Sequence, residues 1–325
     1  MTNAIRIHKT GGPEVLTWEA VEVGTPGPGE VRLEQTGVGL NFIDVYHRTG
    51  LYPLAALPSA IGMEAAGRIE SVGEGINDLK PGDRVAYAAP PPGAYAEARI
   101  MPADRLVKLP DGISDLQAAA MMLQGMTVQY LIRRTFRVNK GDTVLFHAAA
   151  GGVGLIACQW LKHLGATVIG TVGSDEKAEL ARAHGCDHPV NYRTENFVER
   201  VREITEGAGV PVVYDSVGKD TFESSLDCLA PLGMFVGFGN ASGPVAPFNM
   251  GVLAQKGSLF LTRPTLMTYT AKRDDLLASA NDLFDVVLSD AVKIEINQTY
   301  PLAETAQAHR DLEARKTTGS TVLLP

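Results

Sequence analysis

The stretch His147-Ala148-Ala149-Ala150-Gly151-Gly152-Val153-Gly154 decides the fold of this 325-residue chain. It follows an apolar run at residues 143–147 that is typical of a buried strand, and it precedes a helical pattern at residues 155–164. A glycine at position 151 lets the backbone approach a pyrophosphate, and Gly154 lets the helix pack closely on the strand. The N–H groups and the positive dipole end of that helix attract phosphate. We therefore expect a dinucleotide at this bend, although Ala149 replaces the first glycine of the usual pattern.

Strands and helices alternate on the C-terminal side of the glycine stretch. Five further apolar runs predict strands at residues 167–172, 188–191, 212–214, 234–238 and 258–262. Helical patterns between them lie at residues 175–184, 196–205 and 221–229. Six strands in this cadence predict a doubly wound parallel sheet, the Rossmann α/β fold. The competing interpretation, a structural turn in an unrelated α/β protein, does not explain the cadence.

The N-terminal part has a different character. Short alternating runs such as residues 30–34 and 66–72 lie between glycine and proline turns, which predicts a compact β-rich domain, barrel-like or a sandwich, without helices regular enough to build a βαβ series. A long helix is predicted from the capping box of Ser114 and Gln117 to about Arg134.

The tail offers helices at residues 273–288 and 302–315 and strands at residues 292–294 and 321–324. We expect the tail to return to the first domain. The predicted division is a catalytic domain at residues 1–124, completed by 264–325, and a nucleotide-binding domain at 125–263.

The end of the second Rossmann strand indicates which dinucleotide binds. NAD enzymes place a carboxylate there to bind the ribose hydroxyls, whereas this strand ends in Gly173 and Ser174. Asp175 comes next, Lys177 follows at helical spacing, and Tyr192 comes after the third strand. A hydroxyl, an ammonium and a phenol suit a 2′-phosphate, so NADPH is the predicted cofactor. The alternative is that Lys177 belongs to a solvated helix face.

Composition excludes several classes of function. The net charge of −8 argues against nonspecific nucleic-acid binding, and no apolar run is long enough to span a membrane. The chain has three widely spaced cysteines, Cys158, Cys186 and Cys228, which fits a reducing, cytoplasmic compartment. Because the first domain contains no cysteine, neither a structural zinc cluster nor a thiolate-bound catalytic zinc is expected.

Two further motifs carry a family resemblance. Gly37-Val38-Gly39-Leu40-Asn41-Phe42-Ile43-Asp44 and the residues after it resemble the N-terminal signature of zeta-crystallin-like quinone oxidoreductases. These are zinc-independent members of the medium-chain dehydrogenase/reductase superfamily. The similarity continues through Gly62-Met63-Glu64-Ala65-Ala66-Gly67 and the glycine stretch. Zinc-dependent relatives carry Cys in place of Asn41 and His in place of Met63. Gln124 stands where some relatives carry a basic residue.

The resemblance implies a GroES-like first domain, a cleft between the domains, a homodimer, and metal-free reduction of quinones by hydride or electron transfer from NADPH. It implies that Asn41, Tyr46 and Tyr52 face the quinone. It also implies a set of cofactor-binding residues, namely Asn41, Thr127, Gly151, Gly152, Val153, Gly154, Gly173, Ser174, Lys177, Tyr192, Ser216, Phe238, Gly239, Asn240 and Ser242.

Other interpretations stay open at this point. Tyr46 and Tyr52 are equally consistent with core aromatics whose hydroxyls are satisfied. An NADPH-dependent enone or alkene reductase would share the fold. A non-catalytic nucleotide- or RNA-binding protein is a third alternative, against which the acidic charge weighs.

Overall fold

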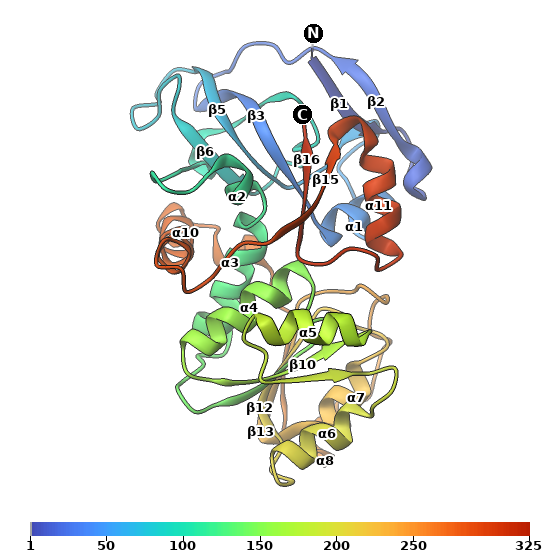
Figure 1. Ribbon diagram of the computed structural model, residues 1–325. Helices are drawn as coiled ribbons and strands as arrows, with labels where there is room; N and C mark the ends of the chain where they lie inside the picture. Colours follow the sequence, from blue (N-terminus) through green and yellow to red (C-terminus); the bar gives the residue numbers. More distant parts are fainter. Residues whose placement is uncertain (1) are drawn as a thin grey trace. The chain divides into compact units, whose positions relative to one another are not determined.

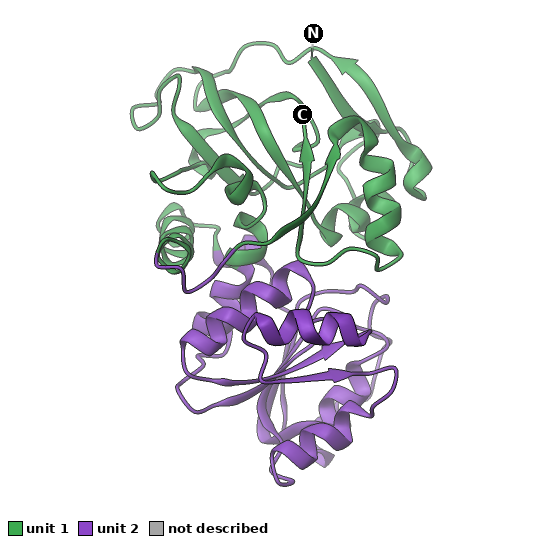
Figure 2. Ribbon diagram, viewed as in Figure 1, with its two compact units in different colours: residues 1–126, 270–288, 294–325 green, residues 127–269, 289–293 purple. Residues whose placement is uncertain are grey.

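The computed structural model describes residues 2–325 and divides into two compact units (Figure 2). Unit 1 comprises residues 1–126, 270–288 and 294–325, and unit 2 comprises residues 127–269 and 289–293. Figure 1 shows unit 1 as a strand-rich body and unit 2 as a sheet covered by helices.

Unit 1 is built on two sheets, a three-stranded sheet of order β2-β1-β4 and a seven-stranded sheet. The larger sheet has the order β15-β16-β3-β5-β6-β8, with β7 also paired to β3. The strands of unit 1 are β1 (Thr2–Ile7), β2 (Leu16–Val21), β3 (Glu30–Leu40), β4 (Ser59–Ala60), β5 (Glu64–Val72), β6 (Arg84–Ala88), β7 (Ala98–Pro102), β8 (Val107–Lys108), β15 (Ile296–Pro301) and β16 (Ser320–Leu324). Its helices are α1 (Phe42–Thr49), α2 (Asp115–Ala119), α10 (Arg273–Leu288) and α11 (Thr305–Glu313), and α3 (Met122–Tyr130) begins here.

The tail contributes strands to the larger sheet of unit 1. Strand β16 pairs antiparallel with β3, placing Val322 opposite Gly39, and β15 pairs parallel with β16. Buried aliphatic side chains on these strands, such as Val38 and Leu323, join one hydrophobic core with those of β1 and β6. The residues that form this apolar surface are far apart in the sequence, and its burial holds the tail in the sheet.

Unit 2 is a six-stranded sheet of order β11-β10-β9-β12-β13-β14, in which every pairing is parallel. Counted along the chain this is the order 3-2-1-4-5-6 of the doubly wound fold, which confirms the predicted class. Its strands are β9 (Thr143–Phe146), β10 (Thr167–Val172), β11 (His188–Asn191), β12 (Val210–Asp215), β13 (Leu229–Gly237) and β14 (Phe260–Thr262). Its helices are α4 (Gly152–His163), α5 (Asp175–Ala183), α6 (Phe197–Ile204), α7 (Phe222–Asp227), α8 (Gly251–Gln255) and α9 (Leu266–Tyr269).

Two secondary-structure predictions were wrong, and the N-terminal part also contains one short helix, α1, for which no prediction was made. The long helix predicted from Ser114 is divided into α2 and α3 and ends in a π-helical turn at Leu131–Thr135, although the Ser114–Gln117 capping box is present. Residues 292–294 form no strand, and the strand of this region is β15.

Candidate active site

The glycine stretch forms the bend between β9 and α4. Gly151 is the N-cap of α4, and a Cβ added to Gly154 would lie 2.3 Å from the carbonyl oxygen of Ala148. No side chain fits at that position, so the helix packs against the turn as the motif predicts. The first-turn N–H groups of α4 lack partners within the helix and are donors for an anion.

Gly170 on the neighbouring strand β10 makes room for Ala149, the alanine that replaces the first glycine of the usual motif. Ala149 is buried, and a Cβ added to Gly170 of β10 would lie 2.6 Å from the Cβ of Ala149. The methyl group of Ala149 therefore occupies space that Gly170 leaves open. Ala148, next to it, adopts a left-handed φ of 57°, which is unusual for a residue with a side chain.

The groups predicted to bind a 2′-phosphate gather at the end of β10. Ser174 caps α5 by accepting a hydrogen bond from the backbone N–H of Lys177 at 3.3 Å. A Cβ added to Gly173 would lie 2.7 Å from the hydroxyl oxygen of Tyr192, so this glycine leaves room for the phenol. Asp175 is engaged elsewhere, because its carboxylate accepts a hydrogen bond of 2.8 Å from Nδ2 of Asn191. The arrangement fits a phosphorylated ribose better than a bare one.

Two loops at the carboxyl ends of β12 and β13 contain five of the six remaining predicted cofactor residues of unit 2. Gly239 approaches the loop after β12 so closely that an added Cβ would lie 2.5 Å from the carbonyl oxygen of Ser216. The hydroxyl of Ser242 donates to the carbonyl of Val217 at 2.8 Å, so it holds the two loops together. The five residues brought together in this way are Ser216, Phe238, Gly239, Asn240 and Ser242. Thr127 is buried on α3, outside these loops.

A chain of buried polar side chains surrounds Asn41 in unit 1. Asn41, at the N-cap of α1, donates from Nδ2 to Oε2 of Glu64 at 2.6 Å. Its Oδ1 accepts from Nε2 of Gln124 at 3.2 Å, and Oε1 of Gln124 accepts from the hydroxyl of Ser320 at 2.7 Å. The other oxygen of Glu64 accepts from the backbone N–H of Leu123 at 2.7 Å. All four side chains are buried, and burial raises the pKa of Glu64 to about 8.

Tyr46 and Tyr52 lie next to each other. Their ring centroids are 5.1 Å apart in an edge-to-face arrangement, and the backbone N–H of Tyr52 donates to the carbonyl of Tyr46 at 3.0 Å. Tyr46 is buried and Tyr52 is half-buried. The structure therefore brings these two predicted residues together.

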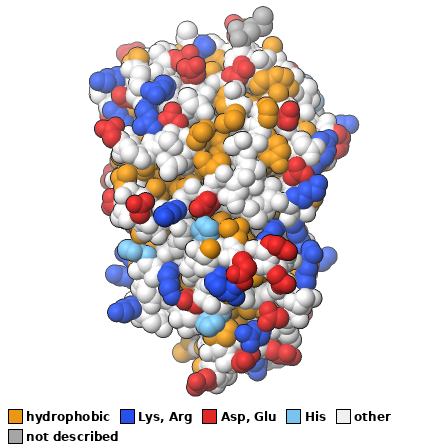
Figure 3. Space-filling view, viewed as in Figure 1, with side chains coloured by type: hydrophobic (Ala, Val, Ile, Leu, Met, Phe, Trp, Pro, Cys, Tyr) orange, Lys and Arg blue, Asp and Glu red, His pale blue; other side chains and the backbone are white. Residues whose placement is uncertain are grey.

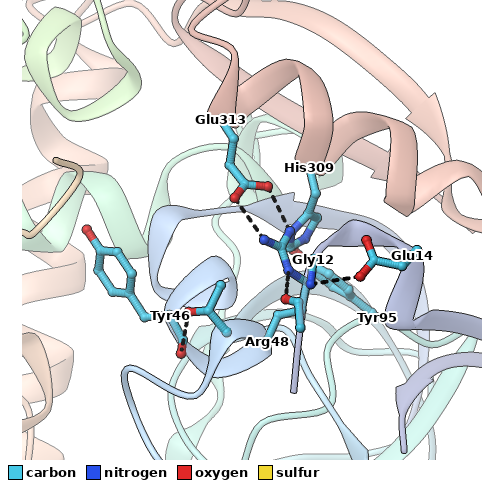
Figure 4. A network of polar contacts seen from close by, with 9 residues as sticks. Gly12, Glu14, Tyr46, Arg48, Tyr95, His309 and Glu313 are labelled. Atoms are coloured by element: carbon cyan, nitrogen blue, oxygen red, sulfur yellow. Dashed lines mark hydrogen bonds and ion pairs between the residues drawn. The ribbon is translucent and has the colours of Figure 1, made fainter. Parts of the chain in front are cut away.

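Sequence reasoning assigned no role to a second buried network, which centres on Arg48 of α1 (Figure 4). Arg48 is 1% exposed and donates to both carboxylate oxygens of Glu313, at 2.9 and 2.8 Å, and to Nδ1 of His309 at 2.9 Å. Tyr95 contacts Nε2 of His309 at 3.0 Å and donates to Asp44 at 2.8 Å. Figure 4 shows the side chain of Tyr46 pointing away from this network.

The chemistry of Arg48 determines the protonation state of His309. A guanidinium only donates, so Nδ1 of His309 accepts and the ring is neutral with its proton on Nε2. Burial, together with the charge of Arg48, lowers the pKa of His309 to about 3. Burial also raises the pKa of Asp44 to about 7. The network stabilises the packing of α11 against α1. It could not be predicted from the sequence, because a lone arginine within a helical segment does not indicate its partner.

Residues 2–325 contain neither a cluster of metal ligands nor a membrane-spanning helix. No three His, Cys, Asp or Glu side chains in this part of the chain are grouped as metal ligands would be. Asn41 and Glu64 bond to each other, as described above. No helix among these residues is both long and apolar enough to cross a bilayer.

Comparisons with known proteins agree with this architecture. The chain matches the family models described as "Alcohol dehydrogenase GroES-like domain" over residues 27–111 and "Zinc-binding dehydrogenase" over residues 152–275. These matches confirm the predicted GroES-like part. A quinone oxidoreductase of Pseudomonas aeruginosa is 55% identical over 325 residues, which cover 100% of each chain.

Two further similarities come from a curated protein and a solved structure. A 2-haloacrylate reductase of a Burkholderia species is 50% identical, covering 100% of this chain and 99% of the relative. The crystal structure of the Escherichia coli quinone oxidoreductase complexed with NADPH matches with a TM-score of 0.98 at 49% identity. That match covers 99% of this chain and 100% of the other.

Proposed function

This chain belongs to the zeta-crystallin-like quinone oxidoreductases of the medium-chain dehydrogenase/reductase superfamily, and from that premise we propose that it reduces quinones with NADPH. The observation that carries the cofactor assignment is the end of β10. There Asp175 is held by Asn191, and Gly173 leaves room for the hydroxyl of Tyr192. The strand ends in Gly173 and Ser174 without the carboxylate tip that would select NADH, and Lys177 and Tyr192 add an ammonium and a phenol.

The residues of unit 2, together with Asn41 of unit 1, bind and orient the cofactor. Backbone N–H groups at Gly151, Gly152, Val153 and Gly154 bind the pyrophosphate, and Gly173, Ser174, Lys177 and Tyr192 bind the 2′-phosphate. Residues lying along the rest of the cofactor are Asn41, Thr127, Ser216, Phe238, Gly239, Asn240 and Ser242. When bound, NADPH supplies the hydride or electron that reduces the acceptor.

The residues of unit 1 face the acceptor. Asn41 presents an amide that is oriented by buried neighbours, and Tyr46 and Tyr52 present an aromatic pair. A quinone is already electrophilic, so positioning suffices and no Lewis acid is required. The reduced quinone takes its proton from water or from a tyrosine hydroxyl.

The same proposal covers the domain boundaries, the oligomeric state and the cellular location. We propose a catalytic domain at residues 1–124, completed by 264–325, and an NADPH domain at 125–263. The compact units, which change at residues 126/127 and 269/270, support this division. A homodimer is proposed from the family resemblance. A cytoplasmic location is supported by three free, buried cysteines.

A second activity, reduction of an activated alkene, is favoured by one observation. The relative named 2-haloacrylate reductase is 50% identical over the whole chain. The alternative of an RNA-binding protein has no such support, and Figure 3 shows acidic and basic side chains intermixed over the face in view.

Oxidation of NADPH and of NADH, measured across benzoquinone, naphthoquinones, enones and 2-chloroacrylate, tests the proposal. We expect the highest kcat/KM with NADPH and a quinone, unchanged by a metal chelator. Preference for NADH would refute the cofactor assignment. A higher kcat/KM with 2-chloroacrylate than with every quinone would establish the alkene reductase instead.

A further inference from the structure

Glu64 is the one member of the Asn41 chain that cannot reverse its hydrogen-bonding role. The hydroxyl of Ser320 and the amides of Gln124 and Asn41 each carry both a donor and an acceptor. An ionised carboxylate only accepts, and both oxygens of Glu64 face N–H donors, Nδ2 of Asn41 and the backbone N of Leu123. Donation therefore runs in one direction, from Ser320 through Gln124 and Asn41 to Glu64.

The direction of this chain determines what Asn41 offers to a ligand. One N–H of its amide is used by Glu64, and its oxygen accepts from Gln124 and takes part in the capping box with Asp44, which leaves the second N–H on the Glu64 side for a ligand. If the chain ran the other way, the amide would be turned over and its NH2 group and its oxygen would exchange places. An acceptor that needs a donor would then meet an oxygen.

We propose that Glu64 is a positioning residue which, in its ionised form, accepts hydrogen bonds at both oxygens and so fixes the orientation of the Asn41 amide toward the substrate carbonyl. The proposal rests on the proposed function, in which Asn41 faces the acceptor. Gly39 of β3 makes the arrangement feasible, because a Cβ at that position would lie 2.3 Å from Oε2 of Glu64. The backbone thus leaves room for the carboxylate directly beside Asn41.

The variant Glu64→Gln makes the proposal testable without removing any hydrogen bond. The backbone N–H of Leu123 is a fixed donor, so Oε1 of the new side chain must face it and the new NH2 group must face Asn41. Asn41, Gln124 and Ser320 then reverse in turn, and every group keeps a partner. At a pH above the pKa of Glu64, where the native carboxylate is ionised, we expect a folded variant whose kcat with a quinone is lower than the native value by about tenfold or more.

Protonation of Glu64 places a donor at the same point and so has the same effect as the substitution. The titratable groups around Glu64 are Asp44, Tyr87 and Tyr95, all buried. We expect kcat of the native enzyme to fall as the pH drops through the pKa of Glu64. This fall of kcat should be absent from the pH profile of the Glu64→Gln enzyme. Any fall of kcat due to Asp44 should remain in the pH profiles of both enzymes.

A double-mutant cycle separates positioning from a structural role. In the Asn41→Ala background we expect Glu64→Gln to change kcat by less than about twofold, because no amide remains to be turned. Tyr300→Phe is the control, since it removes a half-buried hydrogen bond to Asp311 in the same unit, away from Glu64, and should leave kcat unchanged. Thermal unfolding and NADPH affinity are measured for each variant.

The outcomes separate the positioning role of Glu64 from the placement of Asn41 at the acceptor. An equal loss of kcat from Glu64→Gln in both backgrounds, or a native kcat retained by Glu64→Gln while Asn41→Ala is impaired, overturns the positioning role alone. A native kcat in Asn41→Ala overturns the placement of Asn41 at the acceptor, and the inference falls with it. Identical pH profiles of the native and Glu64→Gln enzymes also overturn the positioning role.

Discussion

The side-chain amide of Asn191, at the end of β11, donates to the carboxylate of Asp175, at the start of α5, over 2.8 Å. This bond occupies one oxygen of the carboxylate that lies nearest the second strand and directs it toward β11. Ser174, Lys177 and Tyr192 are the hydroxyl, ammonium and phenol near this position that suit a 2′-phosphate.

Lys177→Ala should weaken NADPH binding and leave NADH binding unchanged. An ammonium contributes a charge-assisted bond to a phosphate, so we expect KM for NADPH to rise by about tenfold, which corresponds to about 1.4 kcal/mol. Steady-state kinetics with both cofactors gives the measurement. Lys140→Ala, an exposed lysine in the turn before β9, is the control and should change neither KM. An unaltered KM for NADPH in Lys177→Ala would assign this lysine to the solvated helix face.

Gly154→Ala should destabilise the protein and weaken cofactor binding together. The added methyl would lie 2.3 Å from the carbonyl oxygen of Ala148, which is backbone and cannot rotate away. We expect a loss of about 1–3 kcal/mol in the free energy of unfolding. At Gly151 the nearest atom to an added Cβ is 3.3 Å away, so Gly151→Ala should cost less. Denaturant unfolding compares the two variants, and equal stabilities would show that the predicted close packing is not required.

Glu313→Ala should destabilise unit 1 strongly although Glu313 itself is partly exposed. Its partner Arg48 is 1% exposed and would keep a buried charge without a counter-ion. Such a loss costs on the order of 3 kcal/mol. Glu179→Ala, which removes an exposed pair with Arg182 on α5, should cost less than about 1 kcal/mol. If chemical denaturation gives the same small loss for both variants, the buried pair contributes little.

The neutral state of His309 makes stability dependent on pH. Its pKa is lowered from 6.5 to about 3 in the folded protein, so between these values the unfolded chain binds more protons. The stabilisation is therefore complete above pH 6.5 and is lost as the pH falls toward 3. His309→Asn retains an acceptor for Arg48 but has no such titration. The stability advantage of the native protein over this variant should shrink between pH 7.5 and pH 4, as measured by thermal unfolding in parallel buffers. An advantage that grew with acidity would contradict a neutral His309.

The Rossmann unit was the most predictable part of the molecule, because its signals are local. Each strand is a short apolar run and each helix shows its own period, so the cadence and the glycine bend predicted the fold class. The helix α10 was predicted with its observed bounds, Arg273–Leu288. No helix was predicted at α1, although its capping box at Asn41 and Asp44 is a local signal, whereas the buried pairing of Arg48 with Glu313, 265 residues away in sequence, has none.

The sequence by itself determined where a phosphate-binding bend lies and that the strand beside it ends without a carboxylate tip, since both depend on residue type at adjacent positions. The tertiary structure alone decided that Asp175 is occupied by Asn191, that Gly170 makes room for Ala149, and that Glu64 and Gln124 hold the two ends of the Asn41 amide. These relationships depend on which strands and helices become neighbours. That choice is made by burial of apolar surface over the whole chain, and no local window of sequence contains it.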